Sequence, residues 1–346
     1  MKAAITSKLN LDQRTRLEEV IPLRTPFLLY VDPSSACNFK CRFCPTGHKD
    51  LLRVSEYKRG ILDFTLFEKL IRDLETFPNP LKVMRMNKIG EPLLNKKLPE
   101  MIALAKAGGC VEYIDLATNA ALFSPVLLSR LVESGLDRIN ISLEGINREQ
   151  YLEHAQVDFD FDQLVGNIRW LYAHRGKCEV TIKIPANLLG EGDRERFFDL
   201  FGDYCDRIFV EELSPIWPEF DLEQRANITV RDQAGQYQPN AKDKQVCTYI
   251  FYAMAINSDG TVSACCPDWD QRLLIGDLHR ESLLDIWNSP QLRQLQRSNL
   301  QGKRGEHPIC KACGHVKYAQ VDDIDDHKES LLRKFDGHRS VEVAPN

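Results

Sequence analysis

Several features that mark other protein classes are missing from this sequence. No apolar run approaches the roughly 18 to 20 residues that cross a bilayer, and the N-terminus lacks the basic-then-apolar order of a secretory signal. The formal net charge of -5 is spread along the chain without a basic block, which argues against a surface for nucleic acid or anionic lipid. We therefore expect a cytoplasmic protein that acts on a small molecule or peptide and engages neither membrane nor nucleic acid.

A disulfide framework is also not expected, although cysteine is plentiful. The chain has 11 cysteines, an odd number, and without a secretory signal its thiols would stay reduced. Clustered thiols in such a protein usually hold metal. The isolated Cys110, Cys178 and Cys205 are expected to be small buried hydrophobes. The other eight form an early and a late group: Cys37, Cys41 and Cys44, then Cys247, Cys265, Cys266, Cys310 and Cys313.

The chain is long and apolar enough to fold, with 346 residues of which 43% are hydrophobic. Over residues 27–215, β-rich runs alternate with amphipathic helical stretches, which is typical of a parallel sheet with crossover helices. Six repeats are too few for a complete eight-stranded barrel, so we predict an α/β fold with a partial (β/α)6 TIM-like barrel. The six expected strands are 27–31, 82–87, 111–117, 138–143, 179–184 and 207–213.

Less regular segments flank the expected barrel. Residues 1–26 would form an N-terminal extension, and 216–246 would form a connector, because that stretch is polar and has no sustained period. A second, smaller unit is expected over 247–320, with a hairpin turned at Gly260 and then a short helix. The charged C-terminal tail, 321–346, is expected to be a solvated helix or arm.

The early cysteines have the spacing CxxxCxxC and directly follow the first expected strand. At that edge a parallel sheet presents its loops to a central site. Three thiolates on one short loop can bind three irons of a [4Fe–4S] cluster and leave the fourth open to a chelating substrate or cofactor. The alternative is a structural zinc site with His48 as the fourth ligand, since Cys3His is a common tetrahedral set.

At Cys37, Cys41 and Cys44 the sequence resembles the radical S-adenosylmethionine (SAM) superfamily. The hallmark of that family is this spacing with an aromatic or apolar residue, here Phe43, before the last cysteine. The resemblance implies that SAM chelates the open iron of a [4Fe–4S] cluster and is cleaved by the reduced cluster to a 5′-deoxyadenosyl radical. It also implies an external electron donor such as flavodoxin or ferredoxin.

Three further matches follow successive expected strands. Ile89-Gly90-Glu91-Pro92 looks like the GGEP element that holds the SAM amino group, although an ordinary turn is an alternative. Thr118-Asn119-Ala120 stands where relatives often have Thr-Asn-Gly, and Ser142-Leu143-Glu144-Gly145 stands where they have Ser-Leu-Asp-Gly. By this resemblance the candidates for binding SAM are Phe43, Gly90, Glu91, Pro92, Asn119, Ser142 and Glu144.

The late cysteines resemble a second family feature. Cys247, twelve residues, Gly260, four residues and Cys265 resemble the opening of the SPASM extension of radical SAM enzymes, and Cys310 and Cys313 add two thiolates. Four ligands suffice for one further [4Fe–4S] cluster, so the resemblance implies a small twitch/SPASM-like auxiliary cluster domain. A zinc-ribbon-like knob is the alternative.

Cys266 lies next to a proposed ligand of that second cluster. It is expected to point away from the cluster as a packed thiol.

An auxiliary cluster ligated by four cysteines has no open iron, so its expected task is to move electrons. This favours SAM-dependent oxidation, or another radical transformation, of a carbohydrate-like or nucleotide-linked small molecule. Loss of a hydroxyl proton requires a general base, and the candidates are Glu211, Glu212, Arg231 and Lys183. The sequence does not identify the substrate.

Two other functions stay open at this point. One is radical modification of a ribosomally made peptide by thioether formation or epimerisation. Few residues precede the first expected strand, whereas many peptide modifiers carry a leader-binding domain there, which counts modestly against this hypothesis. The other is a zinc-stabilised, non-catalytic binding protein.

Overall fold

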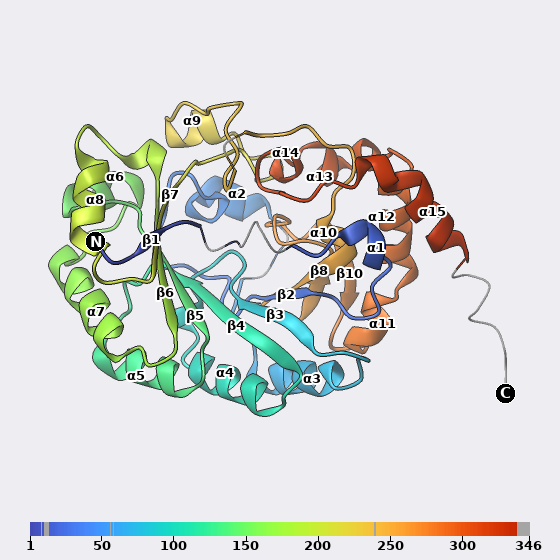
Figure 1. Ribbon diagram of the computed structural model, residues 1–346, viewed down its shortest axis with the longest axis horizontal. Coiled ribbons are helices and arrows are strands. Elements are labelled where there is room, and N and C mark those ends of the chain that lie inside the picture. Colours follow the sequence, from blue (N-terminus) through green and yellow to red (C-terminus); the bar gives the residue numbers. More distant parts are fainter. Residues whose placement is uncertain (8, 10–13, 56, 58, 239, 338–346) are drawn as a thin grey trace.

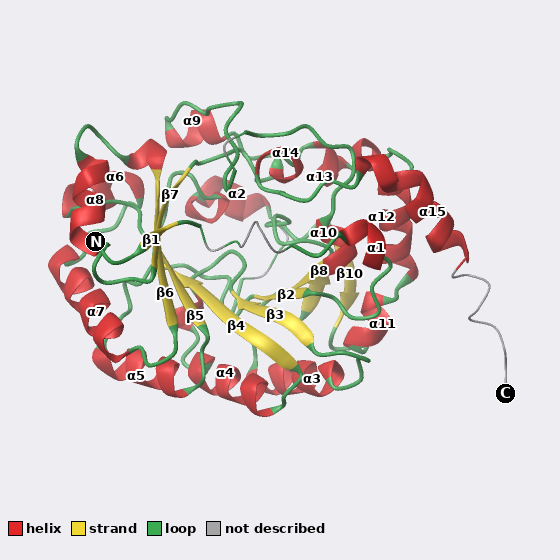
Figure 2. Ribbon diagram, viewed as in Figure 1, coloured by secondary structure: helices red, strands yellow, loops and turns green. Residues whose placement is uncertain are grey.

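A single mixed sheet runs through the molecule. The computed structural model describes residues 1–7, 9, 14–55, 57, 59–238 and 240–337. Within these residues the strands follow the order β1-β7-β6-β5-β4-β3-β2-β8-β9-β10 (Figures 1 and 2). None of the helices described is both long and apolar enough to cross a membrane.

The six strands expected for the barrel are confirmed, with ends displaced by no more than two residues. Neighbouring strands from β2 to β7 pair in parallel, so their carboxyl ends lie at one edge. Alternate residues such as Ile139, Ile141, Ile182 and Ile184 are fully buried and form the core between sheet and helices. The strands are β2 (Leu28–Val31), β3 (Leu81–Met86), β4 (Val111–Thr118), β5 (Arg138–Ser142), β6 (Glu179–Pro185) and β7 (Arg207–Glu211).

Amphipathic helices cover the outer face of this curved sheet (Figure 1). In the first of them, the buried residues Leu66, Phe67, Leu70, Ile71 and Leu74 recur every three or four positions and face the strands. Several begin at an Asp, Ser or Asn whose side chain accepts the N–H of a first-turn residue. The helices are α3 (Phe64–Leu74), α4 (Leu98–Ala107), α5 (Pro125–Glu133), α6 (Arg148–His154), α7 (Phe161–His174) and α8 (Asp193–Phe201).

Strands outside the six repeats extend the barrel sheet at both edges. β1 (Ala4–Ile5) pairs in parallel with β7. β8 (Ala253–Ile256) pairs in parallel with β2 and antiparallel with β9 (Thr261–Ser263), so the expected hairpin at Gly260 is present. β10 (Leu274–Asp277) completes the sheet. The late segment therefore shares a sheet with the barrel, and the domain limits drawn from the sequence stay a prediction.

Short helices build the remainder of the chain. Trp287 is fully buried, and its indole N–H donates to the carbonyl of Leu23 at 3.0 Å, which joins the C-terminal part to the N-terminal segment. The helices are α1 (Leu17–Val20), α2 (Lys49–Val54), α9 (Leu222–Ala226), α10 (Tyr249–Tyr252), α11 (Leu283–Trp287), α12 (Pro290–Leu300), α13 (Pro308–Lys311), α14 (His315–Tyr318) and α15 (Lys328–Gly337). The 3-10 turns are Pro45–Gly47, Pro92–Leu94, Ala186–Leu188, Arg304–Glu306 and Asp325–His327.

The charged tail forms a helix, α15, that is not solvated on every side. Leu331 and Phe335 are buried, and the helix packs against α12. The last part of the expected tail, 338–346, lies outside the described residues. The three isolated cysteines, Cys110, Cys178 and Cys205, are buried as expected.

Candidate active site

The loop that carries Cys37, Cys41 and Cys44 lies at the carboxyl end of β2. All three thiols line a cavity of about 210 Å³, called here the cysteine cavity. The backbone turns tightly, because the N–H of Cys44 donates to the carbonyl of Cys41 at 3.1 Å. Burial raises the pKa of Cys37 to about 12, so a bare thiol there stays protonated, whereas iron would supply the positive charge that a thiolate needs. This donor set fits a [4Fe–4S] cluster with one open iron.

Gly90 allows the loop after β3 to lie directly on the cysteine loop. A Cβ atom at this position would come within 1.9 Å of the carbonyl oxygen of Ser34 and 2.5 Å of that of Ala36. The N–H of Glu91 then donates to the carbonyl of Ala36 at 2.8 Å. Only glycine permits this contact, so the Ile89-Gly90-Glu91-Pro92 segment is more than an ordinary turn.

The carboxylate of Glu91 braces the loops around the cysteine cavity. Its Oε1 accepts from the Thr118 hydroxyl at 2.7 Å and from the N–H of Leu93 at 3.0 Å. Asn119 in turn donates from its side chain to Asn38 on the cysteine loop at 2.9 Å. Burial raises the pKa of Glu91 to about 7, although the hydrogen bonds that its carboxylate accepts act to lower that pKa. Glu91 and Asn119, both expected to bind SAM, therefore also fix the wall of the cavity.

Glu144 brings a buried carboxyl group to the same cavity. It is 6% exposed, and its Oε2 has no hydrogen-bond partner among the described residues. Burial raises its pKa well above the ordinary range, and Lys183 opposes that rise. A buried acceptor of this kind fits an ammonium or hydroxyl donor on a bound molecule. Phe43, Gly90 and Ser142 also line this cavity, whereas Pro92 does not.

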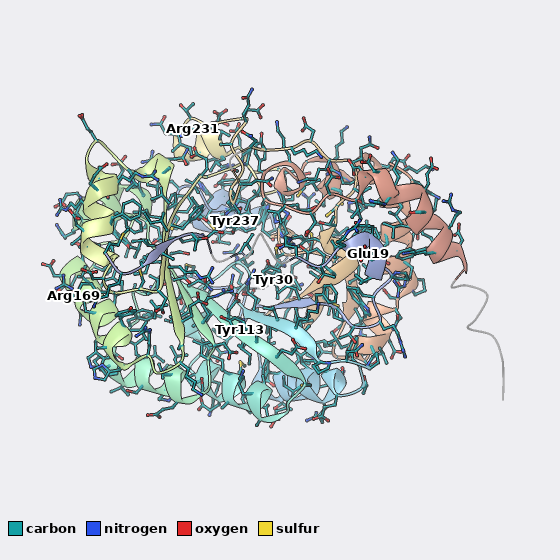
Figure 3. The ribbon with its side chains drawn as sticks, viewed as in Figure 1. Glu19, Tyr30, Tyr113, Arg169, Arg231 and Tyr237 are labelled. Atoms are coloured by element: carbon teal, nitrogen blue, oxygen red, sulfur yellow. The ribbon has the colours of Figure 1, made fainter. Side chains whose placement is uncertain are left out.

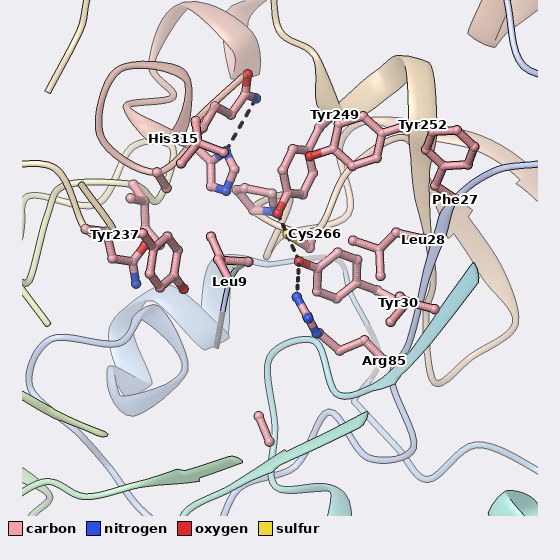
Figure 4. Close-up of a pocket in the computed structure, with 18 of the residues that line it drawn as sticks. Leu9, Phe27, Leu28, Tyr30, Arg85, Tyr237, Tyr249, Tyr252, Cys266 and His315 are labelled. Carbon is pink, nitrogen blue, oxygen red and sulfur yellow. Dashed lines mark hydrogen bonds between the residues drawn. The ribbon is translucent and has the colours of Figure 1, made fainter. Parts of the chain in front are cut away.

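A second, larger cavity of about 570 Å³ adjoins the first (Figure 4). The two share four lining residues, Asn87, Ala117, Ser142 and Lys183.

Inside this large cavity, hydrogen bonds link three side chains in a row. Arg85 donates from Nη1 to the Tyr30 hydroxyl at 3.2 Å, and that hydroxyl lies 3.1 Å from the hydroxyl of Tyr249. Cys266 also lines the cavity, beside Tyr249 in Figure 4. Cys266 is therefore only partly packed, and its expected orientation away from the auxiliary cluster stays a prediction.

The four general-base candidates separate into two groups. Lys183 lines both cavities and forms an ion pair with Glu211, which lines the cysteine cavity. Glu212 instead accepts from Asn187 at 3.3 Å and lies 3.6 Å from Arg231. Arg231 is 73% exposed at the outer edge of the molecule near α9 (Figure 3). The structure therefore brings Lys183 and Glu211 to the site, and places Glu212 and Arg231 outside both cavities.

Sequence reasoning missed Arg85, Tyr30 and Tyr249 as cavity residues. A signal was present, because Arg85 and Asp115 are charged residues flanked on both sides by apolar residues within expected strands, and charges are buried only when paired. They form a buried bidentate pair, with Nε 2.8 Å and Nη2 2.7 Å from the two carboxylate oxygens. The tyrosines gave no such signal.

The four expected ligands of the late group come from three separate segments. Cys247 precedes α10, Cys265 follows β9, Cys310 lies in α13 and Cys313 follows it. Burial, together with the charge of nearby Cys247, raises the pKa of both Cys310 and Cys313 to about 12. Gln320 donates to the Cys247 sulfur at 3.0 Å. Four neighbouring thiols in a buried pocket fit a cluster ligated by cysteine alone.

The zinc alternative loses its proposed fourth ligand at the early site. His48 Nε2 lies 2.9 Å from the carbonyl oxygen of Arg42, and its Nδ1 lies 3.4 Å from Arg225. Both ring nitrogens thus already have partners other than the cysteines.

A partial parallel barrel with three thiolates at its carboxyl edge defines the class of iron–sulfur enzymes that bind a cofactor at an open iron. The Radical SAM superfamily model matches residues 31–200, and the model of the SPASM iron-sulfur cluster-binding domain matches residues 247–314. The chain belongs to the radical SAM superfamily and carries a SPASM domain. Its cofactors are accordingly SAM and two [4Fe–4S] clusters.

Two curated relatives align along most of this chain. The tungsten-containing aldehyde ferredoxin oxidoreductase cofactor-modifying protein of Pyrococcus furiosus is 31% identical over 333 residues, which is 85% of this chain and 90% of the relative. The S-adenosyl-L-methionine-dependent 2-deoxy-scyllo-inosamine dehydrogenase of Niallia circulans is 22% identical over 308 residues, 86% of this chain and 96% of the relative.

The crystal structure of BtrN in complex with AdoMet and 2-DOIA shares the fold. Its TM-score is 0.55 at 18% identity, and the match covers 86% of this chain and 97% of that one. At this identity the likeness concerns the fold alone.

Proposed function

We propose that this enzyme oxidises a carbohydrate-like or nucleotide-linked small molecule, or transforms it by another radical route, with the auxiliary cluster as electron acceptor. One observation carries the proposal. The large cavity reaches from the cysteine cavity, with which it shares Ser142 and Lys183, to Cys266, the neighbour of the auxiliary ligand Cys265. A substrate in this cavity would lie between the two cofactors.

When bound, SAM and its cluster supply a radical that removes a hydrogen atom from the substrate. The chain itself must hold the substrate and accept its hydroxyl proton. Burial pulls the pKa of Lys183 down, but Glu211 outweighs it and leaves that pKa raised. Lys183 therefore stays charged, and the Glu211 carboxylate beside it is the better proton acceptor of the pair.

The dehydrogenase among the relatives supports this reaction class. It acts, by its name, on a cyclic amino alcohol with SAM, and it aligns with this chain over 96% of its own length. The hydroxyls of Tyr30 and Tyr249 in the large cavity are suited to a substrate of similar polarity. We also propose flavodoxin or ferredoxin as the external electron donor.

Anaerobic reconstitution tests the proposal. The wild-type protein should bind about eight irons and release 5′-deoxyadenosine when dithionite is added. Cys41→Ala should abolish this release and lower the iron content by about half. Cys110→Ala, at a buried thiol outside both groups, is the matched control and should behave like wild type. Unchanged 5′-deoxyadenosine release by Cys41→Ala would contradict the assignment.

A further inference from the structure

The described charged residues that line the large cavity are all cationic. Among the described residues that line it there is no Asp or Glu. The cysteine cavity has the opposite character, since Glu91, Glu144 and Glu211 line it with Lys183 as its lone Lys or Arg in the described chain. The cationic residues of the large cavity are Arg14, Lys82, Arg85, Lys88, Arg138 and Lys183.

Four of these cations have carboxylate partners that do not line the large cavity: Asp322 pairs with Arg14, Asp115 with Arg85 and Arg138, and Glu211 of the cysteine cavity with Lys183. Arg85 and Arg138 both bond the carboxylate of Asp115, at 2.7 and 2.9 Å. Asp115 is fully buried, so its charge is hidden from the cavity while the guanidinium of Arg85 faces it (Figure 4). A planar guanidinium held in this way is oriented in advance for an anion.

Lys88 is a buried cation whose hydrogen bonds go to neutral oxygens. Its Nζ donates to the side chains of Asn257 and Ser263 and to the carbonyl of Asp268. It forms no ion pair within the described chain. Asp32 lies nearby, but burial raises its pKa to about 7, so its negative charge is incomplete near neutral pH. Lys88 therefore contributes a fixed positive charge to the cavity.

Lys82 is an exposed cation at the rim. Its Nζ lies 3.7 Å from the centre of the Phe27 ring and 3.4 Å from the Thr15 hydroxyl, with no ion pair among the described residues. Together with Lys88 it leaves the cavity with positive charge that its own walls do not balance. Burying an unpaired positive charge costs free energy, and a bound anion offsets that cost.

We propose that the substrate is an anion whose phosphate or carboxylate group binds at Arg85 and the hydroxyl of Tyr30, with Lys88 adding positive charge from the cavity wall. The reacting carbon then lies toward Ser142, where the two cavities meet. This inference rests on the proposed function, because it takes the large cavity as the substrate site. The cations of the large cavity would attract the anionic substrate and disfavour cationic SAM there.

A series of hexoses matched in size and different in charge tests the proposal. Reconstituted enzyme with SAM is titrated calorimetrically with glucose 6-phosphate, glucuronate, glucose and glucosamine. The anions should bind at least about tenfold more tightly than glucose, and glucosamine most weakly. The two anions together distinguish a phosphate preference from a carboxylate preference.

Variants then locate the anion. Arg85→Gln should reduce the preference for anions over glucose by about tenfold. Lys82→Gln should reduce it by a smaller factor, and it changes an exposed residue without breaking a buried pair. Arg72→Gln, on the outer surface of α3, is the control and should change nothing.

Failure of this inference can be told from failure of the proposed function. Equal affinity for glucose and its 6-phosphate, tightest binding of glucosamine, or no anion-specific binding at millimolar concentration would overturn the anionic substrate while 5′-deoxyadenosine release continues. Absence of that release with intact clusters would instead overturn the proposed function.

Discussion

The carboxylate oxygen Oε2 of Glu91 accepts the backbone N–H of Asn119 at 2.9 Å, so the loops after β3 and β4 are joined at the edge of the cysteine cavity. In Glu91→Gln the side-chain NH₂ group would face one of the donors that the carboxylate of Glu91 now accepts, so a buried hydrogen bond would be lost. Since an unsatisfied buried group costs about 1–3 kcal/mol, SAM affinity should fall about tenfold or more. Calorimetry of SAM binding to the reconstituted enzyme measures this, with exposed Glu112→Gln as control. Wild-type affinity in Glu91→Gln would show that the brace is dispensable.

Gly90→Ala should disrupt the same region sterically. The new methyl would meet backbone oxygens of the cysteine loop, which cannot turn aside as a side chain can. We expect a loss of about 1–3 kcal/mol in stability and weakened loading of the first cluster. The melting temperature and iron content report both effects. Gly60→Ala is the matched control, because nothing lies within 4 Å of a Cβ there. Equal behaviour of the two variants would count against a locked pair of loops.

Cys313 and Cys266 should differ in their effect on iron content. Cys313→Ala removes an expected auxiliary ligand, so about half of the iron should be lost while SAM cleavage continues. Cys266→Ser changes a thiol in the large cavity and should retain all of the iron. Iron analysis with the 5′-deoxyadenosine assay separates the two outcomes. If Cys266→Ser lost iron and Cys313→Ala did not, Cys266 and not Cys313 would be the cluster ligand.

Asp32, just after β2, should make stability depend on pH. It is 1% exposed, and neither carboxyl oxygen has a hydrogen-bond partner among the described residues. Burial raises its pKa to about 7, against the pull of Lys88, whereas the unfolded chain has the ordinary value near 4. Between these values the folded state holds one more proton. The free energy of unfolding should therefore fall as the pH rises from about 4 to about 7.

Asp32→Asn removes this titration. Its melting temperature should exceed that of wild type at about pH 7 and depend less on pH below it. Melting curves from about pH 5 to about pH 8 measure the difference, with exposed Asp162→Asn as control. A parallel pH dependence in Asp32→Asn and wild type would mean that this carboxyl is already ionised in the folded protein.

The barrel was predictable because its signals are local. Each strand has its own apolar run and each crossover helix its own period, so β2 to β7 could be found one at a time. The early cysteine loop was predictable for the same reason, since three ligands lie within eight residues. Lys183 and Glu211 could be proposed from their places at strand ends.

Features set by distant partners were not predictable. Nothing within residues 253–256 shows that the outer edge of that strand pairs with β2, because the pairing spans more than two hundred residues. The orientation of Cys266 depends on how the hairpin is placed against the barrel. Leu331 and Phe335 in the charged tail are likewise buried only because α12 lies beside them.

The parallel pairing of β8 with β2 also constrains how the protein can be re-engineered. Four residue pairs, from Leu28 with Ala253 to Val31 with Ile256, join β2 and β8 through their backbones. This pairing sets the position of the C-terminal half, and with it the late cysteine segment, relative to the barrel. The proposed electron transfer from substrate to auxiliary cluster depends on that position, because electron tunnelling slows steeply with distance. A chimera that exchanges C-terminal halves between relatives should therefore take its junction before β8 and preserve this alignment.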